Sequence, residues 1–394
     1  MLTPISPSIN MNPIPYGRQH ITEADIEAVA EVLRSDFLTQ GPKIEEFEKK
    51  FADYIGAKYA VAVSNGTTAL HLCTLALEVN SSQKVITTPI TFAASANCVR
   101  YCGGEVVFSD IDANSYLLDL NKVEDLLKKN PNSYKGIIPV DFMGLAVNLE
   151  ELKQLTDKYG LWIVEDACHA PGGYFIDSKN NRQNCGNSNF ADLAIFSFHP
   201  VKHIATGEGG MITTNSKKLY DKLLILRTHG ITKNPELMHK NDGGWYYEMQ
   251  ELGYNYRLSD MQAALGISQL TRADEGLARR KQIAVKYNEA FKSLPITTPL
   301  YAEGHAYHLY VILSDNRKEL YDFLRKKNIF CQVHYIPVHT LPYYQQLGWK
   351  AGDMPVAENY YEKCLSLPMY PSLSEEDQDR VIEAVKEFYN SIAK

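Results

Sequence analysis

The sequence predicts an α/β protein in which a mostly parallel, seven-stranded sheet covered by helices is followed by a smaller α+β domain. Two observations lead to this fold class. Seven short apolar runs recur between residues 58 and 214, and most of the segments between them have the periodicity of helices. From about Ser259 the pattern changes to one long helical stretch and then to a mixture of short strands and helices. Alternating strands and helices are typical of a parallel sheet with helices on its faces.

The expected elements follow in order along the chain. Thr22 can cap a helix, is followed by acidic residues, and precedes a helix expected to end near Arg34. Strands are expected at residues 58–63, 84–88, 105–110, 136–141, 161–165, 191–197 and 209–214. After them we expect a helical stretch over 260–294, strands at 306–313 and 331–335, and helices at 317–327 and from about residue 375. A boundary near Pro295 divides the chain into a large domain, 13–294, and a small domain, 295–394.

The composition is that of an ordinary soluble enzyme. A chain of 394 residues, 45% of them hydrophobic, can bury a large core, and its net charge of −7 gives no basic surface for nucleic acid. No apolar run approaches the roughly 18–20 residues that span a bilayer. Residues 1–12 lack the features of a signal peptide, so we expect a cytoplasmic protein. The seven scattered cysteines indicate free thiols. Cys98 and Cys102 lack a second ligand pair, so no metal site is expected.

A lysine follows the sixth expected strand. Ser197 ends the apolar run, Lys202 comes five residues later, and glycines follow at 207, 209 and 210. A lysine in this position, with a hydroxyl upstream and glycines downstream, suits an amine that forms a Schiff base beside a bound phosphate. The alternative is a surface lysine in a loop, which is where most lysines lie.

Acidic residues end the fifth expected strand. The apolar run 161–164 continues into Glu165 and Asp166, and carboxylates at such strand ends lie where open α/β sheets bind ligands. Asp166 can pair with the pyridinium nitrogen of pyridoxal phosphate and keep it protonated, so that the ring accepts electrons from a breaking C–H bond. Asp166 alone can equally be a helix N-cap. Together with Ser197 and Lys202 after the next strand, it favours the catalytic interpretation.

A third segment offers a phosphate site. The expected strand 58–63 is followed by Gly66, Thr67 and Thr68 at the start of a helical pattern that runs to about Leu77. Free backbone N–H groups, two hydroxyls and the positive end of the helix dipole bind phosphate. The alternative is a capped helix without a ligand.

Together these segments resemble the DegT/DnrJ/EryC1/StrS sugar aminotransferases, a branch of the aspartate aminotransferase-like fold (fold type I of the enzymes that use pyridoxal phosphate, PLP). The similarity covers roughly residues 13–370. The matching pieces are residues 41–42, 47–48, 64–70, 89–94, 165–167, 197–199 with Lys202, 208–210 and 253–258. The resemblance implies pyridoxal 5'-phosphate as cofactor, L-glutamate as amino donor, a nucleotide-linked ketosugar as acceptor, and a homodimer with shared active sites.

The resemblance also implies roles for single residues. Phe92 is placed over the cofactor ring and His169 against its other face, although core packing and a satisfied histidine explain them equally well. Ser197 is placed on the cofactor phosphate, and Asn255 reaches that phosphate across the dimer interface. Arg257 can bind the donor carboxylate through its planar fork, or form an interface ion pair instead.

Further resemblance concerns the acceptor sugar. Residues 14–19, 38–42 and 199–202 are most similar to enzymes that aminate C4 of a UDP-linked 4-keto-6-deoxy-N-acetyl sugar for pseudaminic acid biosynthesis. The substrate contacts implied in this way are Tyr16, Leu38, Thr39, Gln40, Tyr256, Arg257, His334, Tyr335, Ile336 and Pro337.

Three alternatives remain open at this point. The cofactor-binding motifs do not determine which sugar binds, so the nearest alternative is the same chemistry on a GDP- or dTDP-linked ketosugar. A dehydratase relative, in which the family replaces the lysine by histidine, disagrees with Lys202. A non-catalytic sensor that binds the cofactor is the third, and the chain shows no separate DNA-binding or receptor domain to serve it.

Overall fold

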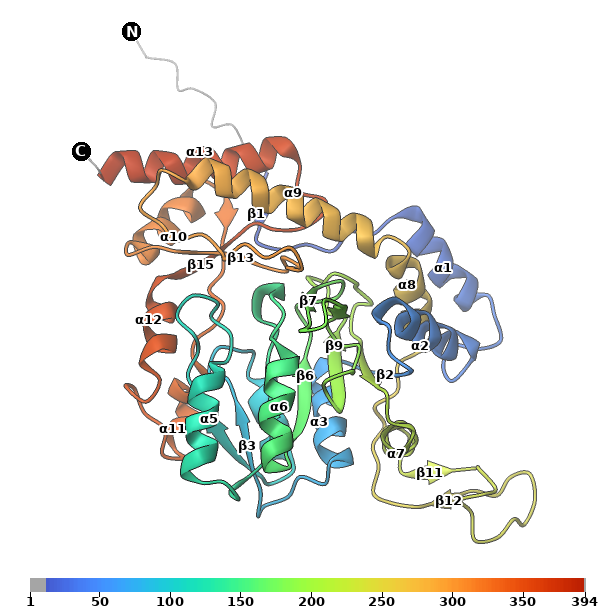
Figure 1. Ribbon diagram of the computed structural model, residues 1–394. Helices are drawn as coiled ribbons and strands as arrows, with labels where there is room; N and C mark the ends of the chain where they lie inside the picture. The colour runs from blue at the N-terminus through green and yellow to red at the C-terminus, as the bar shows by residue number, and fades with distance from the viewer. Residues whose placement is uncertain (1–11, 393–394) are drawn as a thin grey trace.

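A seven-stranded sheet forms the centre of the large part of the molecule in the computed structural model, which describes residues 12–392 (Figure 1). The strand order is β2-β10-β9-β6-β5-β3-β4. Strand β10 is antiparallel to both neighbours, and the remaining pairs are parallel, so the predicted mostly parallel sheet is confirmed. Its strands are β2 (Tyr59–Val63), β3 (Lys84–Thr87), β4 (Glu105–Phe108), β5 (Tyr134–Ile138), β6 (Trp162–Asp166), β9 (Leu193–Ser197) and β10 (Gly210–Thr214).

Helices cover both faces of this sheet, because successive strand residues point to opposite sides. Val164 packs into a core shared with α3, α4 and α7, whereas Ile163 packs into a second core shared with α5 and α6. Figure 1 shows α5 and α6 lying across this second face. The helices of this part are α1 (Glu23–Leu33), α2 (Pro42–Ile55), α3 (Gly66–Ala76), α4 (Ala94–Tyr101), α5 (Leu120–Lys129), α6 (Leu149–Tyr159), α7 (Lys217–Arg227) and α8 (Asp260–Leu270).

Local sequence explains where several of these helices begin and end. Thr22 caps α1 as predicted, and its backbone N–H donates to Asp25 Oδ2 at 2.8 Å in a capping box. Helix α2 has Pro42 in its first turn and ends at Gly56, whose φ of 87° is the left-handed conformation that glycine adopts without strain. These ends fix the approach of the chain to β2 and to the turn that starts α3.

The remaining elements include a second lobe with its own apolar core. Strand β13 pairs antiparallel with β15, and β1 pairs parallel with β14. Helix α9 and Ile14 also contribute to this core, and the boundary near Pro295 stays a prediction. The elements are β1 (Ile14–Pro15), β7 (Tyr174–Ile176), β8 (Arg182–Asn184), β11 (Ile231–Thr232), β12 (Glu248–Met249), α9 (Ala273–Phe291), β13 (Tyr310–Leu313), α10 (Arg317–Lys326), β14 (Ile329–Phe330), α11 (Pro342–Gln345), α12 (Pro355–Lys363), β15 (Cys364–Leu367) and α13 (Glu375–Ile392).

The predicted helical stretch over 260–294 is two helices, because tertiary contacts break it. Thr271 bonds back to Ser268 O through its hydroxyl, and the guanidinium of Arg272 reaches Asp25 Oδ2 on α1 at 2.6 Å. These contacts let α8 pack against α1 and α2, while α9 continues into the second lobe.

The structure differs from the prediction at the two expected strands 306–313 and 331–335: the first is shorter, and the second does not form. The first begins only at Tyr310, because Ala306 N–H donates to Gly144 O at 2.8 Å outside any ladder. The second is wrong as a strand: β14 ends at Phe330, and residues 331–335 keep a single bridge between Gln332 and Ser366. Of the helices that the structure describes, none has the length and apolar character needed to cross a membrane.

Candidate active site

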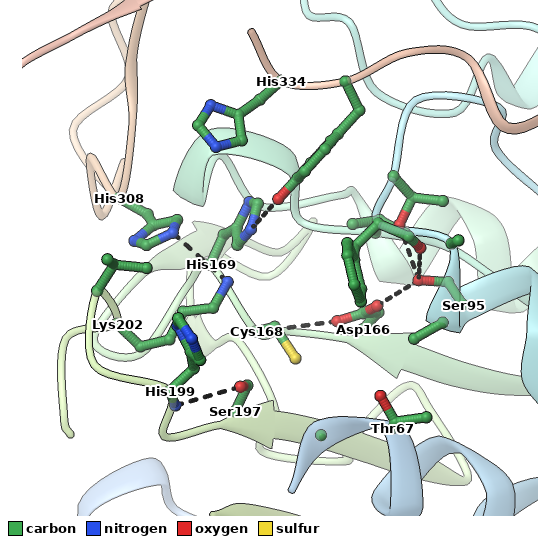
Figure 2. A pocket seen from close by; sticks show the side chains of 18 of the residues that line it. Thr67, Ser95, Asp166, Cys168, His169, Ser197, His199, Lys202, His308 and His334 are labelled. Carbon is green, nitrogen blue, oxygen red and sulfur yellow. Dashed lines mark hydrogen bonds between the residues drawn. The ribbon is translucent and has the colours of Figure 1, made fainter. Parts of the chain in front are cut away.

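A cavity of about 700 Å³ opens where β6 and β9 end and α3 begins (Figure 2). Asp166 and Ser197 are the last residues of the two strands, and Gly66 is the first residue of the helix. Lys202 and the segment 332–336 complete its walls. The three motifs predicted from sequence therefore line one cavity, as the carboxyl ends of neighbouring parallel strands require.

The carboxyl group of Asp166 is held by two hydrogen bonds. Ser95 Oγ donates to Oδ2 at 2.6 Å, and the backbone N–H of Cys168 donates to Oδ1 at 3.2 Å. Both bonds are drawn in Figure 2, and Asp166 itself is only 5% exposed. A carboxylate that accepts two such bonds is fixed in direction and can hold a cationic ring nitrogen at the base of the cavity.

The turn at the start of α3 approaches β9 closely. A Cβ on Gly66 would lie 3.0 Å from Ser197 Cβ, so glycine allows this approach. Asn65 caps the helix by accepting the Thr68 N–H at 2.9 Å, and the Thr68 hydroxyl donates to Asn65 O at 2.8 Å. Thr68 is thus engaged in the cap and outside the cavity lining, whereas Gly66, Thr67 and Ser197 line it.

The amine of Lys202 lies within hydrogen-bonding distance of a histidine. Its Nζ is 3.4 Å from His308 Nε2 (Figure 2). Burial lowers the pKa of Lys202 below its ordinary value, with the cation of Arg280 acting in the same direction. A lysine whose pKa is lowered is more readily available as the neutral amine that attacks a carbonyl carbon.

Aromatic side chains form the rest of the wall. Phe92 lines the cavity and is 64% exposed, so it is not a core residue of this chain. His169 Nε2 and the Tyr335 hydroxyl are 3.1 Å apart, and burial lowers the pKa of His169 well below its ordinary value. Neutral His169 therefore offers a ring face rather than a charge.

The predicted substrate contacts separate into two groups. Those that line the cavity are Tyr16, His334, Tyr335 and Ile336. Those outside its lining are Leu38, Thr39, Gln40, Tyr256, Arg257 and Pro337, and the cofactor residue Asn255 joins them. Asn255 is exposed, and the Tyr256 hydroxyl is 3.1 Å from His71 Nδ1. The roles given to both groups stay predictions.

Sequence reasoning missed Ser95 and His308, and gave no role to Cys168. Ser95 lies on α4, 71 residues before Asp166, and His308 lies 106 residues after Lys202. No local spacing signals such distant partners. A hydroxyl beside the 89–94 motif was the one available hint for Ser95.

A second group of titratable side chains lies buried beside Asp166. Ligand atoms of Asp141, Glu165 and Cys185 all lie within 4.8 Å of one another. Burial, and then the charge of Asp141, raise the pKa of Glu165 well above its ordinary value, and burial also raises the pKa of Asp141. A buried carboxyl group beside a second one favours its neutral form, because two negative charges at this distance repel each other. The geometry is explained without a metal ion, and the prediction of no metal site stays a prediction.

The residues present fit pyridoxal phosphate. Asp166 suits the ring nitrogen, Lys202 suits the aldehyde carbon, and the α3 N-terminus with Thr67 and Ser197 suits the phosphate. Gly66 and Gly210 keep this cradle open, since a Cβ on Gly210 would overlap the backbone of Asn65. Fold and site together define a PLP-dependent aminotransferase of fold type I.

Comparisons with known proteins identify the family. The model of the DegT/DnrJ/EryC1/StrS aminotransferase family matches residues 19–386, and the chain belongs to this family. It is 40% identical to the spore coat polysaccharide biosynthesis protein SpsC of Bacillus subtilis, over 95% of this chain and 96% of SpsC. It is 36% identical to the UDP-4-amino-4,6-dideoxy-N-acetyl-beta-L-altrosamine transaminase of Campylobacter jejuni, over 96% of this chain and 98% of that protein.

The chain also resembles solved structures of sugar aminotransferases. Helicobacter pylori PseC, an aminotransferase involved in the biosynthesis of pseudoaminic acid, superposes with a TM-score of 0.86 at 32% identity, over 96% of this chain and 100% of PseC. The Streptococcus pneumoniae protein named putative sugar aminotransferase Spr1654 has been solved in a PMP form, with a TM-score of 0.88 at 30% identity over 96% of this chain and 100% of that chain. Its PLP form has a TM-score of 0.87 at 29% identity, over 96% of this chain and 99% of that chain. The chain is therefore a PLP-dependent sugar aminotransferase, as its sequence predicts.

Proposed function

We propose that this enzyme transfers the amino group of L-glutamate to the C4 ketone of a UDP-4-keto-6-deoxy-N-acetylhexosamine, in the cytoplasm and on the route to pseudaminic acid. The observation that carries the proposal is the cavity itself, where Lys202 and Asp166 share one space with the polar wall of Tyr16, Gln332 and His334. Relatives named for an altrosamine transaminase and for pseudoaminic acid biosynthesis support the choice of sugar.

Each catalytic side chain has a task that its surroundings allow. Pyridoxal phosphate supplies the electron sink for the C–H bond that breaks. Lys202, as a neutral amine, takes the proton from Cα of the amino donor in one half-reaction. In the other half-reaction it delivers a proton to C4 of the sugar. Asp166, fixed by Ser95, holds the ring nitrogen protonated. Gly66 and Ser197 hold the phosphate in place.

The charges of the cavity support a homodimer with shared active sites. Within the described residues, Lys202 is the one lysine or arginine in the lining, whereas the proposed ligands carry a phosphate, a diphosphate and two carboxylates. Large apolar side chains outside the cavity are exposed, among them Phe37, Trp245 and Leu252 at 53%, 75% and 74%. A second copy that covers these side chains brings further polar groups, with Asn255 and Arg257 as the proposed donors.

A panel of nucleotide-linked ketosugars tests the proposal. Purified enzyme with PLP and L-glutamate is given UDP-, GDP- and dTDP-4-ketosugars, with Lys202→Ala as the inactive control, and amino sugar formation is followed by mass spectrometry. We expect the UDP-linked L-altro ketosugar to exceed its D-xylo epimer at least about tenfold in kcat/KM, which corresponds to about 1.4 kcal/mol. Equal rates on the two epimers contradict this choice of sugar.

A second candidate is amination, at C4 or C3, of another nucleotide-linked ketosugar. The 40% identity to SpsC favours it, because that relative is named for spore coat polysaccharide rather than for pseudaminic acid. A clear preference for a GDP- or dTDP-linked sugar in the same panel would support this candidate.

A further inference from the structure

Three buried histidine rings, those of His169, His308 and His203, lie close enough to Lys202 for its charge to act on their pKa values. The ring of His308 lies between the other two, with centroid distances of 4.3 Å to His169 and 5.6 Å to His203. Within the described residues, the Nδ1 atoms of all three are buried without a hydrogen-bond partner. His203 and His169 use their Nε2 atoms elsewhere, at Ala306 O and the Tyr335 hydroxyl. Only His308 directs Nε2 at the lysine (Figure 2).

The position of His308 is fixed by a buried cation. Arg280 is 1% exposed, and its Nη1 donates to the carbonyl oxygens of Tyr307, His308 and Met369 at 3.2, 3.1 and 3.0 Å. Tyr307 has a φ of 47°, a left-handed conformation that non-glycine residues seldom adopt. Arg280 thus holds the peptide groups before and after His308, and the backbone of the preceding residue is strained.

The protonation state of His308 follows from its surroundings. Burial, and then the charge of Lys202, lower the pKa of His308 well below its ordinary value, and Arg280 and the other two histidines act in the same direction. The ring is therefore neutral and can accept a hydrogen bond at Nε2.

We propose that His308 is a positioning residue that accepts a hydrogen bond from the Lys202 amine whenever that amine is not bound to the cofactor. A bond donated by the amine to Nε2 occupies one N–H and leaves the nitrogen lone pair free to take the substrate proton. His308 itself gains and loses no proton in this step. The inference rests on the aminotransferase chemistry of the family and not on the identity of the sugar.

Three variants separate positioning from packing. His308→Phe keeps the bulk of the ring and removes Nε2, while His308→Gln restores a polar acceptor at similar reach. His305→Phe is the matched control, because His305 is a buried histidine of the same loop and, among the described residues, Lys202 is within hydrogen-bonding distance of His308 and not of His305. The His305 ring stacks on Tyr307, and its Nδ1 accepts the Tyr307 N–H at 2.9 Å. If His308→Phe does not fold, His308→Ala takes its place in the comparison.

The first readout needs no cofactor. In the apoprotein, the rate of reductive methylation of Lys202 by isotope-labelled formaldehyde is measured against pH and mapped by mass spectrometry. The other groups that act on the amine, Asp166, Cys168 and Arg280, are unchanged in all variants. We expect the midpoint of this profile to fall by about half a pH unit or more in His308→Phe, because the charged amine loses an acceptor. His308→Gln and His305→Phe should stay near the wild-type midpoint.

The second readout is the half-reaction with glutamate carrying deuterium at Cα. We expect His308→Phe to slow this step at least about tenfold with a larger isotope effect, and His308→Gln to recover part of the rate, because proton transfer becomes limiting. The proposal is overturned by an unchanged midpoint in His308→Phe, by an equal change in His305→Phe, or by a loss confined to the KM for glutamate. The last outcome would make His308 a donor-binding residue instead.

Discussion

Gly210, the first residue of β10, allows the sheet to approach the turn at the start of α3, which is proposed to bind the cofactor phosphate. A Cβ built on it would lie 2.6 Å from the carbonyl carbon and oxygen of Asn65 and 2.9 Å from Gly66 N, whereas ordinary contact begins at 3.4 Å. In Gly210→Ala the turn must therefore move by about 0.8 Å, since the atoms it meets are backbone. The donor–acceptor distance of a hydrogen bond to phosphate can vary by only about 0.5 Å. We expect at least one of these hydrogen bonds to be lost.

The loss of one hydrogen bond to a charged group is worth about 1.5–3 kcal/mol. The dissociation constant for pyridoxal phosphate should then rise at least about tenfold in Gly210→Ala. Titration of the apoprotein, followed by fluorescence quenching, measures it. Gly244→Ala is the matched control, because nothing lies within 4 Å of a Cβ there. A dissociation constant for Gly210→Ala equal to that of wild type would refute the assignment of this turn to the phosphate.

Three further predictions concern the buried carboxyl pair, the electron sink and assembly. Burial and the charge of Asp141 raise the pKa of Glu165, so the folded chain keeps a proton that the unfolded chain releases above about pH 4.3. The free energy of unfolding therefore falls as pH rises above this value, by up to about 1.4 kcal/mol per pH unit. Glu165→Gln should lose this fall in urea unfolding at several pH values, and parallel profiles would contradict the raised pKa of Glu165. Asp166→Asn should slow the glutamate half-reaction about 10²–10³-fold while cofactor still binds, and a near-normal single-turnover rate would remove Asp166 from its role. Hybrid dimers of Asn255→Ala with Lys202→Ala should regain activity in one of their two sites, whereas inactive hybrids would count against a shared site.

The sequence was sufficient for features that depend on local pattern. Seven apolar runs predicted the seven strands of the central sheet, and strand ends placed Asp166 and Ser197 where a parallel sheet binds ligands. Lys202 followed from its spacing to Ser197. In each of these cases the residues are close in sequence, so local secondary structure alone determines their relative positions.

Features that depend on distant contacts were not predictable in this way. Ser95 and His308 reach Asp166 and Lys202 only once the fold is formed, because 71 and 106 residues separate the partners. The break between α8 and α9 depends likewise on Arg272 meeting a carboxylate of α1.

The predicted residues that lie outside the cavity form a separate group. Leu38 and Asn255 are exposed, and no periodicity or spacing within one chain can place them on a second copy. Only the resemblance to the family gave them a role, which the hybrid-dimer experiment tests.

The central claim, that Lys202 carries the cofactor of an aminotransferase, is tested most directly by borohydride reduction of the PLP-loaded enzyme followed by peptide mapping. We expect one stable adduct, on Lys202, that disappears when glutamate is added before the reduction. An adduct on another lysine, or an adduct on Lys202 that glutamate does not remove, would contradict the account.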